Sequence, residues 1–211
     1  LSFRIGDPDP RVPARAVELV LWRYPSSSDA KAVPAVPAPR DELRQAVRKL
    51  AEIPYSLRVW SERAARTART IAWEDASAVA AVMVHPPDRP PYIEPWSWWF
   101  RVQVAAALVI SHLGSEPWAS SPRRRLLEDL IDGPADWSNS AAIIALYDVA
   151  RRDPTARELV QTTLTQVAHR PVTPPVYQHA IVPAAIALLE LPDPPGGRVV
   201  AGQLPSEFCA A

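Results

Sequence analysis

Residues that could carry out chemistry are few in this sequence and widely spaced. The chain has one cysteine, Cys209, and four histidines: His85, His112, His169 and His179. No two histidines lie three or four residues apart, which is the spacing by which one helix presents two metal ligands. The sequence also lacks a Gly-x-Ser-x-Gly motif for a nucleophilic serine, and its six glycines form no phosphate-binding loop. We therefore expect no metal site, no cofactor and a function other than catalysis.

Aromatic residues are densest at the end of a proline-rich stretch, where a buried helix is expected to begin. They are Tyr92, Trp96, Trp98, Trp99 and Phe100. In one interpretation, Trp99 and Phe100 anchor the helix and the other three rings hold the loop against its neighbour. In the other, Tyr92, Trp96 and Trp98 stand at the mouth of a groove for a partner, because aromatic side chains on loops are common interface anchors. We take these three as candidate partner-binding residues.

Three consecutive arginines, Arg123, Arg124 and Arg125, begin another predicted helix. Positive charge is unfavourable at a helix N-terminus because of the helix macrodipole. Glu128 and Asp129 lie one turn further on and can compensate for this charge. The functional alternative is a patch that binds phosphate or an acidic partner, so the arginines are also candidate binding residues.

Charge and hydropathy exclude several classes of partner. Lysine and arginine total 23, as do aspartate and glutamate, so no long-range field attracts the chain to nucleic acid or an anionic membrane, where a basic stripe is the usual footprint. The longest apolar runs, residues 104–110 and 184–189, are far shorter than the roughly 20 residues of a membrane span. The lone Cys209 can form no internal disulfide, which fits a reducing compartment. We expect a cytoplasmic protein, and a chain that is one section of a longer one.

The 25 prolines mark the ends of predicted helices. Two stretches are too rich in proline for regular structure, and we expect a flexible linker at 26–39 and an extended loop at 85–95. Gly114 is expected to end one helix, and Thr155 with Glu158 to form a capping box at the start of another. The spacing of apolar residues predicts helices at about 9–24, 41–53, 57–67, 71–84, 98–113, 122–133, 136–149, 155–167 and 177–191.

Similar helix-ending motifs recur at Pro117, Pro154 and Pro194, a period of about 40 residues that is typical of helix-pair repeats. The stretch 7–12, DPDPRV, followed by Ala14, Ala16 and Leu19, resembles the opening of a HEAT repeat. Residues 136–146 and 150–154 are similar to a second such unit. The resemblance implies an all-α superhelix, a solenoid of antiparallel helix pairs, over a single domain at 1–195, with an irregular tail at 196–211.

Proteins of the HEAT type serve chiefly as interaction scaffolds, so the resemblance implies binding and brings no catalytic residues. We expect a non-catalytic scaffold whose partner is another protein or another domain of the same protein. One alternative is a helical-repeat enzyme acting on nucleic acid, as HEAT-like DNA glycosylases do, with Trp73, Glu74 and Asp75 as the nearest match. Balanced charge argues against a DNA-binding groove. The other alternative is a binder of small molecules in an aromatic pocket.

Overall fold

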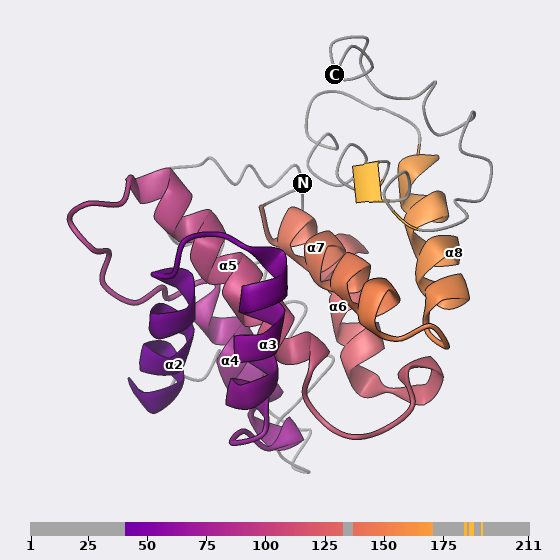
Figure 1. Ribbon diagram of the computed structural model, residues 1–211, viewed down its shortest axis with the longest axis horizontal. Coiled ribbons are helices and arrows are strands. Elements are labelled where there is room, and N and C mark those ends of the chain that lie inside the picture. Colours follow the sequence, from indigo (N-terminus) through magenta and orange to yellow (C-terminus); the bar gives the residue numbers. More distant parts are fainter. Residues whose placement is uncertain (1–40, 133–136, 171–183, 185, 188–190, 192–211) are drawn as a thin grey trace, which may run out of the picture.

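The computed structural model describes residues 41–132 and 137–170, together with residues 184, 186, 187 and 191. Within these residues the chain forms seven α-helices and no strand, so the prediction of an all-α domain is confirmed (Figure 1). Two short 3-10 turns, η1 (Trp73–Asp75) and η2 (Trp118–Ser120), precede helices. The helices are α2 (Asp41–Ala51), α3 (Leu57–Ala68), α4 (Ala76–Val82), α5 (Pro95–Ser111), α6 (Pro122–Asp132), α7 (Trp137–Arg152) and α8 (Arg157–Ala168).

Helix α2 shows how the apolar spacing selects a buried face. Leu43, Val47 and Leu50 are all buried and lie on one side of the helix, because their offsets of four and seven residues match its period. Acidic residues occupy the first turn of α2 and basic residues the last, as the helix dipole favours. The helix ends before Pro54, which cannot continue it.

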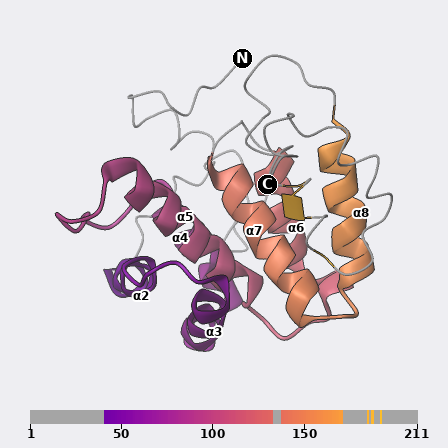
Figure 2. The ribbon, with the colours of Figure 1, turned by 45° about the horizontal axis from the view of Figure 1, so that its top comes forward.

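Helix α5 is the centre of the domain. Its residues from Val102 to Ser111 are all buried, so it is enclosed on every side over its second half. Helices α2, α3 and α4 pack on one side of it, and α6 and α7 on the other (Figures 1 and 2). Pro95 occupies the first turn of α5, and Gly114, with φ of 70°, follows its end in the left-handed conformation predicted there.

Helix α7 is the second buried element, and it contacts α5, α6 and α8. A solenoid brings each repeat into contact with its neighbours only, whereas α5 contacts five other helices here. The described part of the chain is therefore a bundle around α5 and α7 and shows no solenoid or repeat. The near-continuous apolar sequence of α5 is the physical reason, because it leaves no face suited to solvent.

Three local predictions are corrected by the structure. Helix α5 begins at Pro95 instead of Trp98, and the predicted helix at 71–84 is reduced to η1 and the short α4. The capping box is wrong because Asp153 forms the turn instead: its Oδ1 accepts hydrogen bonds from the backbone N–H of Thr155 at 3.0 Å and from its hydroxyl at 2.6 Å.

Several predictions fall outside the described residues. They concern the helix at 9–24, the linker at 26–39, most of the helix at 177–191, and the tail at 196–211. Among the helices that are described, none combines the length and the apolar character needed to cross a membrane.

Candidate functional site

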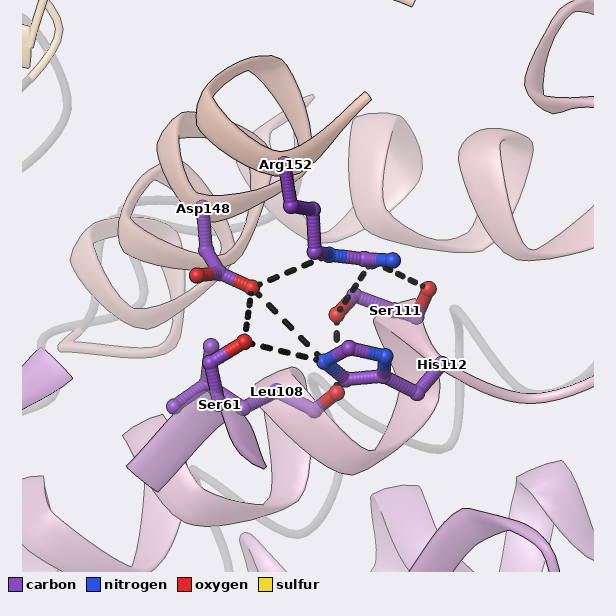
Figure 3. A network of polar contacts seen from close by, with 6 residues as sticks. All are labelled: Ser61, Leu108, Ser111, His112, Asp148 and Arg152. Carbon is purple, nitrogen blue, oxygen red and sulfur yellow. Dashed lines mark hydrogen bonds and ion pairs between the residues drawn. The ribbon is translucent and has the colours of Figure 1, made fainter. Parts of the chain in front are cut away.

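A network of polar side chains lies buried where α3, α5 and α7 meet (Figure 3). The Ser61 hydroxyl donates a hydrogen bond to Oδ2 of Asp148 at 2.7 Å and lies 3.1 Å from Nε2 of His112. The same Asp148 oxygen is 3.7 Å from His112 Nε2. It also accepts a hydrogen bond from Nε of Arg152 at 3.1 Å. Three side chains from three segments thus converge on one carboxylate oxygen of Asp148.

Arg152 extends this network to the end of α5. Its second guanidinium nitrogen donates to the backbone carbonyl of Ser111 at 2.8 Å and to the Ser111 hydroxyl at 3.3 Å. That hydroxyl in turn donates to the carbonyl of Leu108 at 2.8 Å. The last carbonyls of a helix have no partner within the helix, and a cation nearby complements the negative end of the dipole. Arg152 therefore caps α5 while holding Asp148.

Burial sets the protonation states of the network. The pKa of His112 is lowered from 6.5 to about 3 by burial, and then by the positive charges of Arg152, Arg123 and Arg69. Burial also raises the pKa of Asp148, against the opposing effects of the Ser61 hydrogen bond and the Arg152 charge. The His112 ring is thus neutral at pH 7. A neutral ring can donate its Nε2 proton to the Ser61 oxygen.

Ser61, His112 and Asp148 have the residue types of a nucleophilic triad but lack its geometry. In a triad the histidine accepts the serine proton on one ring nitrogen, while the carboxylate holds the other nitrogen. Here Ser61 donates its proton to Asp148 directly, and both oxygens lie at Nε2. The serine hydroxyl therefore has no free base, and Ser61 itself is only 8% exposed. We interpret the network as a structural one, whose hydrogen bonds and ion pairs hold α3, the end of α5 and α7 together.

This network was not predicted, because its members lie far apart along the chain. Ser61 is separated from His112 by 51 positions and from Asp148 by 87. Only Asp148 and Arg152, four residues apart on α7, carry a readable signal, and an i, i+4 pair of opposite charges is common on helices.

The predicted loop between α4 and α5 is confirmed and is held at several points. The indole N–H of Trp98 donates to the carbonyl of Pro87 at 2.8 Å. Arg44 on α2 donates to the carbonyl of Pro86 at 3.0 Å, and Arg89 donates to the carbonyl of Ile93. Since Ile93 is also buried, the loop is fixed to the domain by both polar and apolar contacts.

Of the three candidate aromatic residues, the structure exposes two and buries one. Tyr92 is 75% exposed and Trp96 is 68% exposed, so both rings are accessible to a partner. Trp98 is 1% exposed, which corrects its assignment as an exposed anchor. Its neighbour Trp99, expected on the buried face, is half-buried. The physical reason is that the first turn of α5 has only one side against the domain, and Trp98 points to it.

A shallow hollow lies beside the exposed Tyr92. It has a volume of about 390 Å³, and its walls come from the end of α2, the loop and the first turns of α5. Within it, the guanidinium of Arg101 donates to the carbonyl of Ala51 at 3.0 Å. The lining residues are Glu52, Pro54, Tyr92, Ile93, Glu94, Ser97 and Arg101.

A second cavity lies between α2 and α3 and has a volume of about 630 Å³. Its walls carry side chains of both charges, with Asp41 and Glu42 opposed to Lys49, Arg63 and Arg66. Small-molecule sites are usually apolar with a few converging polar groups. The mixture of charges found here does not favour one class of ligand.

The structure separates the three candidate arginines instead of joining them into one patch. Arg123 donates to the carbonyls of Leu113, Gly114 and Glu116 at 2.8, 3.2 and 2.8 Å, and it lies over the ring of Trp118. Arg124 faces Glu128 at 3.7 Å, which is the predicted compensation. Only Arg125 is exposed. Arg123 thus holds the turn after α5, and its terminal nitrogens are already engaged there.

Two further expectations concern metals and nucleic acid. The described residues contain no group of three or more His, Cys, Asp or Glu side chains that could hold a metal ion. His179 and Cys209 lie outside those residues. Trp73 and Asp75 lie on η1, where the Trp73 ring is partly buried against the core, so it does not stand free in a groove.

No family model, curated protein or solved structure matches this chain. The molecule is an all-helical domain of seven described helices whose family is not identified. What it does must therefore be argued from its own geometry.

Proposed function

We propose that this domain is a non-catalytic interaction module that binds another protein, or another domain of the same protein, at the start of α5. The observation that carries the proposal is a pair of exposed rings: Tyr92, 75% exposed on a loop that is fixed to the domain, and Trp96, 68% exposed in the first turn of α5. Exposed aromatic rings supply much of the energy of protein interfaces. A loop that is already ordered loses little conformational entropy on binding.

The charges around this surface favour a protein partner over nucleic acid. Around Tyr92 and Trp96 the charges are mixed: Glu94 and Arg89 are exposed, and the adjoining hollow is lined by Glu52 and Arg101. Nucleic acid requires clustered cations along the binding surface. An open hollow of about 390 Å³ is also shallow for the enclosed sites that hold small molecules.

Two finer features of the proposal concern the whole chain. A stack of HEAT-like helix pairs stays a prediction supported by the sequences at 7–19 and 136–154. A cytoplasmic location is supported by the single cysteine, Cys209.

A site-specific crosslink tests the proposed surface. A photoreactive phenylalanine analogue is introduced at Tyr92 of the full chain in its native cells, and a matched variant carries it at Val59. Val59 is 37% exposed and belongs to a different element, α3. We expect one defined protein, or one defined site in the same polypeptide, to be captured from position 92 and not from position 59. Equal capture from both positions, or none from position 92, would contradict the proposal.

A further inference from the structure

One side of α3 is strongly basic, although the whole chain has balanced charge. The spacing of its charged residues places them opposite the buried Trp60, Ala64 and Ala68. The exposed arginines on this side are Arg58, Arg63, Arg66 and the residue that ends the helix, Arg69. We call these four residues the arginine face.

The described part of the domain neutralises little of this charge. Glu62, the one acidic residue of α3, forms an exposed ion pair with Arg58 at 3.1 Å. Among the described residues, no carboxylate lies within 4 Å of the side-chain nitrogens of Arg63, Arg66 or Arg69. These three follow one another at offsets of three residues, where like charges on a helix repel. The helix dipole favours the last two arginines but not Arg58 in the first turn.

The arginine face borders the cavity between α2 and α3. Arg63 and Arg66 line the α3 side of that cavity together with Thr67, and Lys49 adds a cation from the α2 side. Cations thus stand on both walls of an open groove. The planar guanidinium of arginine binds a carboxylate through two parallel hydrogen bonds, so a row of exposed arginines suits a ligand with several carboxylates.

The acidic residues at this surface favour a protein segment over nucleic acid. Asp41 and Glu42 are exposed and line the same cavity, and Glu62 lies on the arginine face itself. A nucleic acid carries a phosphate at every nucleotide, so a strand laid along this surface would bring phosphates against carboxylates. Like charges placed opposite each other weaken binding of the wrong partner. An acidic protein segment avoids this cost by placing neutral or basic side chains opposite the three carboxylates.

We propose that the arginine face, together with Lys49, is a second interaction surface and binds an acidic segment of a partner protein. The surface differs from the start of α5 in its residues and in its chemistry, so it adds a second contact to the proposed function. Its affinity for the segment falls as the salt concentration rises, because exposed charges are screened by salt.

Fluorescence anisotropy with the full chain tests this surface. The probe is a labelled helical peptide with glutamates along one side and alanines elsewhere, and the matched probe has glutamine at each glutamate. We expect only the glutamate peptide to bind at low salt. Arg63→Glu combined with Arg66→Glu should weaken its binding about tenfold or more. Arg125→Glu combined with Arg151→Glu makes the same change in net charge at exposed positions of α6 and α7, and should retain the affinity within about twofold.

A second measurement needs no variant. The backbone amide signals of the isotope-labelled chain are recorded by NMR as the glutamate peptide is added. We expect the shifted signals to belong to α2 and α3, and those around Tyr92 and Trp96 to stay unchanged.

Several outcomes would overturn the inference. Equal binding of the two peptides, equal losses in the two double variants, or amide shifts outside α2 and α3 would reject the arginine face. Tighter binding of single-stranded DNA with the same number of charges would make nucleic acid the ligand. The two proposals fail separately, because loss of capture at Tyr92 leaves peptide binding to α3 unchanged. Val59 lies one turn before Arg63, so a protein captured from Val59 alone belongs to the arginine face.

Discussion

The two ends of α5 use side chains in opposite ways. Its C-terminal end adjoins Ser61, His112, Asp148 and Arg152, whose polar atoms bond to one another inside the domain. Its N-terminal end adjoins Tyr92 and Trp96, whose large rings face solvent. Ser, His, Asp and Arg are residue types that often carry out catalysis, but in this domain they hold helices together. Tyr and Trp are residue types that are often buried, but at the start of α5 they lie on the surface. Burial and bonding partners, not residue type, separate structural side chains from candidate functional ones.

The largest expected effect comes from the tryptophan that anchors the N-terminal end. Trp98→Ala should lower the free energy of unfolding by about 3–5 kcal/mol, because it removes a fully buried ring and leaves the Pro87 carbonyl without its donor. Trp96→Ala should change it by about 0.5 kcal/mol or less, since that ring is exposed. Urea denaturation of both variants measures the difference. Equal losses would show that Trp96 belongs to the core.

At the other end of α5, Asp148→Ala should destabilise the domain by about 2 kcal/mol. The substitution leaves the Ser61 hydroxyl and the Arg152 guanidinium without their shared acceptor, although the partial exposure of Arg152 moderates the loss. Glu62→Ala is a suitable control, because it breaks a solvent-exposed ion pair with Arg58 and should cost less than about 0.5 kcal/mol. If both variants unfold at the same denaturant concentration, the network does not stabilise the fold.

The lowered pKa of His112 predicts a dependence of stability on pH. Between pH 6.5 and about 3 the unfolded chain binds a proton at His112 that the folded chain does not, so stability falls as the pH falls. The slope from this residue is about 1.4 kcal/mol per pH unit. The raised pKa of Asp148 acts in the opposite direction, because the folded state then binds a proton more readily than the unfolded one.

Comparing the chain with His112→Gln isolates the histidine contribution. Denaturation curves are measured in steps between about pH 6 and pH 4, where the glutamine variant should lose stability less steeply. Parallel pH profiles for the two proteins would mean that the ring titrates normally in the fold.

The smallest expected effects distinguish the arginines on α6. Arg123→Ala should destabilise by about 1–2 kcal/mol, since it removes three hydrogen bonds to the turn after α5 and the contact with Trp118. Arg125→Ala, at an exposed position, should change the free energy of unfolding by about 0.5 kcal/mol or less. Thermal melting checks both. A larger loss for Arg125 would show that it has a structural partner.

The sequence predicted the features that depend on neighbouring residues. Local spacing and backbone preference predicted the buried face of α2, the loop after α4 and the left-handed Gly114 that follows α5. The early start of α5 at Pro95 was not predicted, because a proline is equally suited to a loop and to a first helical turn. Trp98, and not Trp99, is buried because it lies one turn before Val102 on the side of α5 that faces the domain. The polar network was missed because its bonds join residues that only the folded chain brings together.

The most direct test of the central claim is the dissociation constant for the partner captured at position 92. It is measured for the unaltered chain, for Trp96→Ala and for Trp96→Phe, with a melting curve for each protein. The account predicts that Trp96→Ala weakens binding by about 2 kcal/mol, or about 30-fold, at an unchanged melting temperature, and that Trp96→Phe retains most of the affinity. An unchanged dissociation constant for Trp96→Ala, or a loss matched by an equal fall in melting temperature, would contradict it.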